Sequence, residues 1–427
     1  MCNSHSFRRG LLALISGMAI ALPMLLVGAL SAWGGLYPLG ETKGISRLSD
    51  KPIPFKTPPD LPDRPALLWE FGDPFLGTGK LKHGFEIPTG AVWQPRLQIF
   101  GTLRTVVQTS DNGVSGQVSE WRNRLDLYAN LALTGTEKIL LGLRPLDENE
   151  LSQFTGCGFE PSSSDGCDDE FFNLNIRTLF FEGDLGSLFP NFDPGGFTAL
   201  DFGFTVGRQL FQFQEGMLLN DEIDAIGLSR NNIRLPGVPN LRVSGLWGWN
   251  EIDRPGARGN PRRSNETAQM FALFNSADLE TSTVNLDIIY VDDPEPNGTG
   301  LYLGIASIQR IGHYNTAFRI NNSLAFDTDT PQVSSGTLLS AEISWTPKSS
   351  DDVAYINPFI TSGTFTQAGR EPIVGGPLGG LGILFASPSL GNFGSELSSF
   401  ANQEGTWLTT PRMSDRGVAL SCDKARV

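Results

Sequence analysis

Alternation of apolar and polar side chains between Trp121 and Arg144 restricts the possible fold of this chain more than any other feature. Residues 124–133 alternate without a slip, with Leu125, Leu127, Ala129, Leu131 and Leu133 on one side and Arg124, Asp126, Tyr128 and Asn130 on the other. After the turn at 134–137, a second run continues to Arg144 with the same period. A period of two is that of a β-strand, whereas an α-helix repeats every 3.6 residues. The sequence therefore predicts an antiparallel hairpin here.

The same alternation recurs along most of the chain. Further strands are expected at 94–108, 173–180, 201–214, 241–249, 284–290, 316–326 and 339–345, with weaker candidates at 223–233, 268–275, 301–311 and 353–364. No apolar run after residue 32 could form a membrane helix, so a membrane-facing surface would have to be built from strands. We predict an all-β fold, an antiparallel transmembrane β-barrel of about 14–18 strands.

A soluble β-sandwich would show the same period, because its strands also have one apolar and one polar face. Aromatic residues at the predicted strand ends favour the barrel, since such rings collect at membrane–water boundaries. These residues are Trp121, Trp247, Trp249, Tyr290, Phe326 and Trp345.

The strand at 201–214 breaks the alternation in its middle. Phe202, Phe204 and Val206 have one parity, whereas Phe211 and Phe213 have the other. We expect a β-bulge at Gly207, which would turn Arg208 to the polar face.

Sequence character divides the chain into four segments. Residues 1–32 combine Arg8 and Arg9 with a long apolar stretch and small residues, which predicts a secretory signal peptide. Residues 33–89 are rich in Pro and Gly and are expected to be a periplasmic leader or plug segment. The barrel is assigned to 90–405. Residues 406–427 form an atypical C-terminal tail, because they lack the amphipathic, aromatic-ended strand that usually closes bacterial barrels.

Charge and cysteine content exclude several functions. The net charge of −14 becomes −16 when residues 1–32, which hold two arginines and no acid, are removed. Such an acidic chain argues against nucleic acid as a partner. Cys157 and Cys167 bracket a polar loop and are expected to form a disulfide. The three histidines stand apart from any cysteine or partnered nucleophile, so we expect no metal, no cofactor and no enzyme activity.

Basic residues outnumber acids on the polar faces of the predicted strands, although the whole chain is acidic. The arginines proposed to line a solute pathway are Arg96, Arg104, Arg124, Arg144, Arg177, Arg208, Arg242 and Arg319. In a barrel they would create a focused positive field suited to anions. The competing interpretation is that they pair with acids such as Asp126, Asp287 and Glu342 and brace the interior.

The stretch Phe202–Leu219 resembles a strand of the alginate-export-like family of bacterial outer-membrane barrels. The matching core is Val206-Gly-Arg-Gln209, and Gly216-Met-Leu218 stands where the family has Gly-Arg-Leu. The resemblance covers about twenty residues and carries over only to Gly207, Arg208 and Gln209. It implies a porin-like channel that passes an anionic polymer.

These observations together predict a channel in the bacterial outer membrane, in contact with its lipid, for passive passage of hydrophilic and mainly anionic solutes or polysaccharide. Long connections would lie outside the cell and short turns in the periplasm. One alternative is a structural or adhesive barrel whose lumen is plugged. Another is a barrel-embedded enzyme with dispersed catalytic residues.

Overall fold

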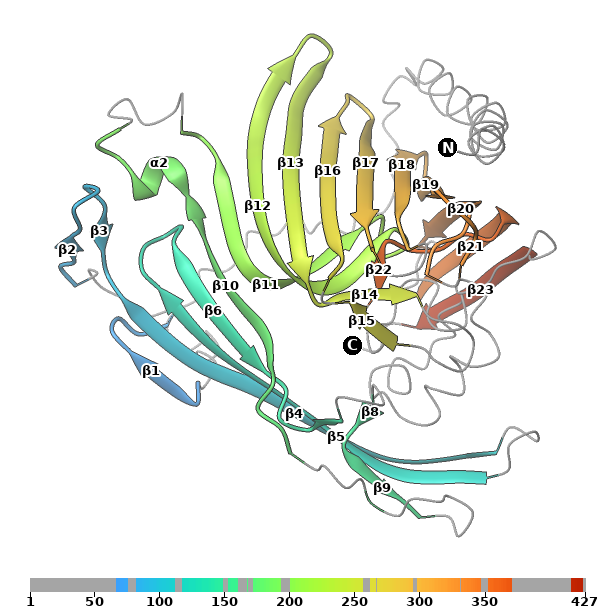
Figure 1. Ribbon diagram of the computed structural model, residues 1–427, viewed down its shortest axis with the longest axis horizontal. Coiled ribbons are helices and arrows are strands. Elements are labelled where there is room, and N and C mark those ends of the chain that lie inside the picture. The colour runs from blue at the N-terminus through green and yellow to red at the C-terminus, as the bar shows by residue number, and fades with distance from the viewer. Residues whose placement is uncertain are drawn as a thin grey trace, which may run out of the picture.

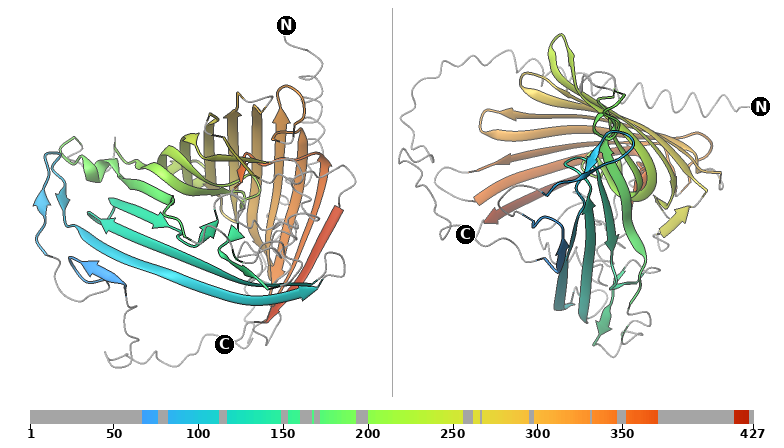
Figure 2. Two further views of the ribbon diagram at one scale, coloured as in Figure 1. Left: turned by 60° about the horizontal axis from the view of Figure 1, so that its bottom comes forward. Right: turned by 90° about the vertical axis from the view of Figure 1, so that its left-hand side faces the viewer.

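A single antiparallel sheet makes up most of the structure. The computed structural model describes residues 67–75, 82–111, 117–148, 153–159, 167, 172–192, 200–255, 262–265, 267–294, 298–330, 332–346, 352–370 and 416–424. The predicted signal peptide and most of the predicted leader lie outside these residues. The hydrogen-bonded sheet contains 17 strands and curves into a trough (Figures 1 and 2).

The first part of the chain supplies β1 to β10. The strands are β1 Trp69–Phe71, β2 Phe85–Glu86, β3 Val92–Trp93, β4 Arg96–Asp111, β5 Gln117–Ala132, β6 Lys138–Leu143, β7 Asp147–Glu148, β8 Gln153–Phe154, β9 Gly156–Gly158 and β10 Ile176–Asp184. The short helix α2, Leu185–Leu188, follows, and the side chain of Asp184 caps it by accepting from the backbone N–H of Ser187 at 2.8 Å.

The remaining strands continue the sheet in chain order, except β14 and β15, which form a separate two-stranded sheet. They are β11 Gly203–Phe213, β12 Leu219–Leu235, β13 Val238–Asn250, β14 Ile252–Pro255, β15 Arg262–Asn265, β16 Gln269–Asp278, β17 Ser282–Asp292, β18 Gly300–Ile311, β19 Tyr314–Ala325, β20 Gly336–Trp345, β21 Asp352–Gly363, β22 Gly369–Arg370 and β23 Arg416–Lys424. Each run of alternation described above coincides with one of the long strands, so the predicted all-β, antiparallel fold is confirmed.

Registered pairs run in one series from β1 through β4, β5, β6 and β10 to β21 and β23. β23 is next to β4 in the sheet order, but no run of registered pairs joins these two strands, and the sheet is not closed. β1 belongs to the segment predicted as a leader, and β23 to the predicted tail. The sheet therefore extends beyond the expected limits of 90 and 405 at both ends.

One row of side chains crosses the sheet on its convex side. In register, it consists of Phe71, Leu97, Leu131, Ile139, Phe181, Val206, Ile226, Trp247, Phe271, Tyr290, Leu301 and Leu324. Every member is apolar or aromatic, and none is buried. Trp247 and Phe271, for example, are 44% and 45% exposed. Soluble monomers rarely expose a continuous apolar surface that spans so many strands.

A second layer covers part of the concave side. The end of β11 and the beginning of β12 curl inward, beside β14 and β22 (Figure 1). Leu218, Leu219 and Ile223 from this curl are fully buried against Met270 and Ile289 of the sheet. β22 pairs in parallel with the first residues of β12 and so extends the layer. The trough therefore has a hydrophobic core on one stretch of its concave side.

Connections alternate in length between the two edges of the sheet. Short turns join β5 to β6, β12 to β13, β16 to β17 and β18 to β19, the shortest being 236–237 and 312–313. Longer connections leave the opposite edge, including 144–175 and 293–299. The pattern expected from the sequence is thus found in part, because the connection 185–202 is long but leaves the edge of the short turns, and 112–116 on the other edge is as short as 133–137.

Candidate functional site

Side chains on the concave side of β12 to β18 change in character along the strands. Near the edge with the long connections, this side is apolar and includes Ala225, Met270 and Val291. Further toward the short turns, the registered rows become polar. One row contains Ser229, Ser244, Phe274 and Asp287, and the next contains Arg242, Ser276, Asn285 and Arg319. The inward curl of β11 and β12 ends over these polar rows.

A polar cavity of about 460 Å³ lies where the curl meets these rows. The side chains that matter below are those of Gln214, Glu215, Arg242, Asn285, Asp287 and Arg319, with Ser229, Ser244, Phe213 and Phe274 completing this part of the wall. Its volume lies within the range of about 300–1,000 Å³ that is usual for small-molecule sites. We call it the concave-face cavity.

The charges around this cavity are paired with one another. Nη1 of Arg319 lies 2.7 Å from Oε1 of Glu342, and Nη2 lies 3.5 Å from Oε1 of Glu215. The amide Nε2 of Gln214 donates to Oδ2 of Asp287 at 2.7 Å. Arg319 and Asp287 are both about 3% exposed, so these contacts satisfy charges that are largely removed from water. Of the two cationic side chains in the lining, Arg242 and Arg319, Arg242 is the exposed one.

The turn that carries Gln214 and Glu215 has an unusual backbone. Both residues have positive φ, 53° and 54°, and Gly216 donates its N–H to the carbonyl of Phe213 at 3.1 Å. Two successive positive φ angles define a type I′ turn, which normally takes Asn-Gly or Asp-Gly. Non-glycine residues in this conformation are held there by their surroundings. Here the contacts to Asp287 and Arg319 hold them over the cavity.

The structure separates the eight arginines proposed from the sequence into small groups. Arg242 and Arg319 line the concave-face cavity. Arg177 and Arg208 line a second cavity of about 670 Å³ beside the beginning of β10. Arg124 and Arg144 both contact Asp126, at 2.6 and 3.0 Å. Arg96 and Arg104 lie far apart on β4.

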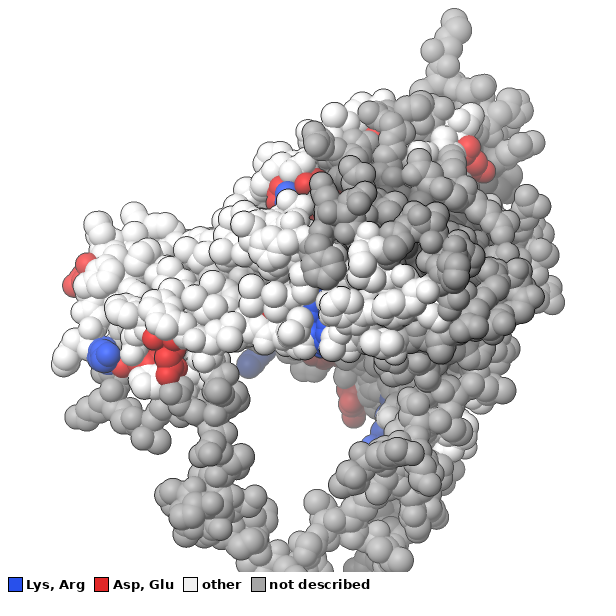
Figure 3. All heavy atoms as spheres, turned by 90° about the horizontal axis from the view of Figure 1, so that it is seen from below, with Lys and Arg blue, Asp and Glu red and all other residues white. Residues whose placement is uncertain are grey.

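Pairing with acids is the commoner role of these arginines. Besides the pairs already described, Arg208 lies 2.9 Å from Asp224 and 3.4 Å from Glu251. In register, Arg104 is opposite Arg124 and is exposed. Lys and Arg also stand among Asp and Glu in small mixed groups on the face shown in Figure 3, and not in a patch of one sign. The arrangement thus favours the bracing interpretation for four of the eight, Arg124, Arg144, Arg208 and Arg319.

The expected β-bulge at Gly207 is wrong. Pairs run through Gly207 without a shift toward both β10 and β12. The irregularity lies instead between Asp224 and Ala225, where the register of β12 with β13 shifts. Phe211 and Phe213 point to the opposite side from Phe204 and Val206 without any bulge, because the curl packs them against the core on the concave side. The second layer, which the sequence pattern does not reveal, explains the apparent break.

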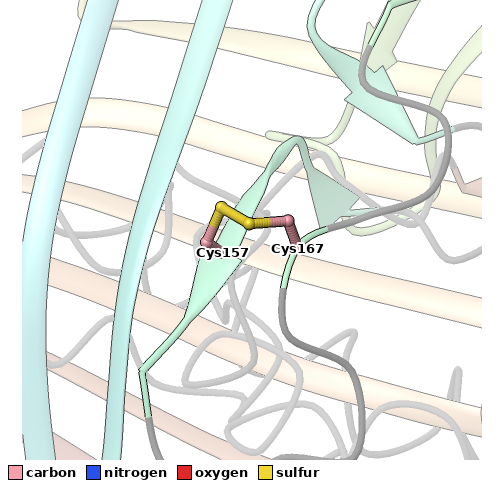
Figure 4. Close-up of a disulfide and its surroundings, with 2 residues drawn as sticks. All are labelled: Cys157 and Cys167. Atoms are coloured by element: carbon pink, nitrogen blue, oxygen red, sulfur yellow. A yellow bond between two sulfur atoms is a disulfide. The ribbon is translucent and has the colours of Figure 1, made fainter.

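The expected cysteine pair occurs in the structure. Cys157, in β9, is bonded to Cys167, and β9 pairs with β5 (Figure 4). Cys157 is paired in register with Trp121 of β5, so the disulfide lies beside the beginning of the predicted hairpin. Within the described ranges, no group of three or more His, Cys, Asp or Glu residues could hold a metal ion.

Sequence reasoning missed several residues of the cavity. Gln214 and its partner Asp287 are 73 residues apart, so no local spacing connects them. Asp287 and Glu342 were recognised only as acids on polar faces. Glu215 lies one residue beyond the strand expected at 201–214, in a turn for which the sequence gives no expectation. The two positive φ angles were not detectable, because neither residue type requires them.

Comparison with known proteins gives structural similarity only. No family model matches the sequence, and no curated protein does. Similar solved structures include OpdQ of Pseudomonas aeruginosa, with a TM-score of 0.36, 11% identity, and coverage of 62% of this chain and 65% of that chain. OccK8 (OprE) of the same species has a TM-score of 0.38, 11% identity, and coverage of 63% and 68%. A BenF-like porin from Pseudomonas fluorescens Pf-5 has a TM-score of 0.37, 8% identity, and coverage of 64% and 68%.

The chain thus covers slightly less than two thirds of OpdQ, the first of these proteins. The resemblance to the alginate-export-like family stays a prediction. In the part of the chain that the structure describes, no helix is long and apolar enough to cross a membrane.

Proposed function

We propose that this protein is a passive channel for small hydrophilic solutes in a bacterial outer membrane. The observation that carries the proposal is the registered row of twelve apolar and aromatic side chains on the convex side, from Phe71 to Leu324, opposite polar rows on the concave side. Lipid outside and water inside would satisfy both faces at once. The long connections would face the exterior and the short turns the periplasm.

We propose only weak charge selectivity for this channel. The sequence favours anionic solutes, but Arg124, Arg144, Arg208 and Arg319 are held by acids. Arg242 is exposed in the concave-face cavity, and no ion pair of this residue is present among the residues described. A remaining preference for anions would therefore depend mainly on Arg242 and on the exposed Arg104.

The test is the reversal potential of the full chain in a planar bilayer under a KCl gradient. We expect a small anion preference, which Arg242→Ala shifts toward cations because it removes an exposed positive charge from the pathway. Arg230→Ala is the matched control, since Arg230 has the same strand parity as Ile226 of the convex row and its guanidinium lies over the ring of Phe202. Protein that inserts but conducts no current would contradict the channel.

A second function has one observation in its favour. The hydrophobic core built by Leu218, Leu219 and Ile223 fills part of the concave side. Such a core suits a plugged barrel with a structural or adhesive role. The same bilayer measurement separates the two, because a plugged barrel inserts without conductance.

A further inference from the structure

We infer that the concave-face cavity is a binding subsite for an uncharged polyhydroxyl solute, a sugar or polyol of monosaccharide size. The inference rests on the proposed channel and names the class of solute that would pause there. It follows from three properties of the cavity: its charge balance, its unsatisfied hydrogen-bonding atoms and its apolar wall.

Charge balance argues against a preference for ions. The lining contains two cations, Arg242 and Arg319, and two anions, Glu215 and Asp287, which sum to zero. Arg319 and Asp287 are also satisfied by Glu342 and Gln214. A ligand whose charge displaced Arg319 or Asp287 from its partner would have to break a buried contact, which costs more than breaking an exposed pair. An uncharged ligand leaves them intact.

Two residues of the lining each carry a buried acceptor without a partner in the described structure. The acceptors are Oε1 of Gln214, whose residue is 6% exposed, and Oδ1 of Asn285. The orientation of the Gln214 amide is fixed, because the carboxylate of Asp287 can bond only its N–H side. Leaving a buried acceptor unsatisfied is costly, so these atoms call for donors from a bound molecule. Hydroxyl groups supply such donors without adding charge.

Further groups of the lining suit the same chemistry. Ser229 and Ser244 share a hydrogen bond at 2.8 Å, and each hydroxyl can also accept or donate to a ligand. The rings of Phe213 and Phe274 are stacked with their centroids 3.3 Å apart, and they form an apolar wall beside these hydroxyls. A sugar presents hydroxyl edges and C–H faces together. The strained turn at Gln214 and Glu215 keeps the acceptor in place, as expected of a site that is formed before its ligand arrives.

Two measurements on the folded full chain test this inference. Equilibrium dialysis in detergent gives the affinity for glucose and for gluconate, its carboxylate relative. Bilayer current measured as glucose is added reports whether the bound sugar obstructs ion flow. We expect saturable glucose binding, tighter than that of gluconate, and a matching saturable fall in current.

The decisive variant is Asn285→Leu, which removes the unpartnered acceptor of this side chain and leaves the contact between Gln214 and Asp287 in place. We expect roughly a two- to tenfold weaker affinity for glucose, the effect of one lost hydrogen bond. Gln309→Met is the control and should bind as the parent does, because Gln309 lies on β18 outside the cavity. If Asn285→Leu does not fold, Gln214→Met removes the other acceptor together with the N–H that bonds Asp287, and it should weaken glucose binding at least as much.

The outcomes separate the two proposals. Absence of glucose binding, equal or tighter binding of gluconate, or unchanged affinity in the folded acceptor variants overturns the sugar subsite. Glucose binding that depends on Asn285 in a protein that conducts no current supports the subsite and overturns the channel. Normal conductance without glucose binding supports the channel and overturns the sugar subsite.

Discussion

Arg254 is the largest fully buried side chain of the described structure, and sequence reasoning gave it no role. It donates to the carbonyl of Gly298 at 2.8 Å and to the hydroxyl of Tyr302 at 2.9 Å, and it also bonds the carbonyl of Ala368. Its Nε lies 3.6 Å from Oδ2 of Asp293, which is also buried. One guanidinium thereby joins β14 to β18, to the connection before it and to the segment leading into β22. In sequence, Arg254 is merely a charge in a polar stretch.

Replacing this residue should loosen the inner layer. We expect Arg254→Met to lower the free energy of unfolding by about 3–5 kcal/mol, because it removes the cation facing the buried Asp293 and leaves several buried carbonyls without a donor. Urea unfolding of the detergent-solubilised protein measures the change. Arg310→Met, at an exposed position, should shift the midpoint little. Equal midpoints for the two variants would contradict the role given to Arg254.

At the scale of elements, the close approach of β11 to β10 depends on Gly207. Its φ is 121°, and a Cβ there would lie 2.2 Å from the carbonyl oxygen of Leu179. We expect Gly207→Ala to destabilise the protein by at least about 1–3 kcal/mol, the usual cost of such a conformation before any clash is added. Gly245→Ala is the matched control, because no atom lies within 4 Å of its Cβ position. Equal urea midpoints for the two alanine variants would show that Gly207 is not required.

Period-two alternation was sufficient to locate the long strands, because a strand with different surroundings on its two faces must alternate. It assigned Asn285, Asp287 and Arg319 to polar faces for the same reason. It failed at Phe211 and Phe213, where a strand leaves the sheet and buries its apolar side on the concave surface. The cavity could not be predicted, since contacts such as Gln214 to Asp287 depend on how far the curl reaches across the trough.

For the whole molecule, the convex row of apolar side chains should determine membrane insertion. We expect Phe271→Arg to reduce assembly into lipid vesicles, since an arginine facing the middle of a bilayer costs roughly 2–4 kcal/mol in a barrel. Leu279→Arg is the control, because Leu279 is similarly exposed but lies in the turn between β16 and β17. The measurement is the fraction of protein protected from protease in vesicles. Equal insertion of both variants would argue that the convex side does not face lipid.

The open sheet has a consequence for assembly into the membrane proposed above. Its two outer strands, β1 and β23, come from opposite ends of the chain, and each leaves one edge without a registered partner. Backbone groups on such an edge cannot be left bare in hydrocarbon, where water is absent. In the proposed channel, the strands between β1 and β23 therefore have to pair with one another before they enter the bilayer, and the free edges of β1 and β23 have to find partners as they do so.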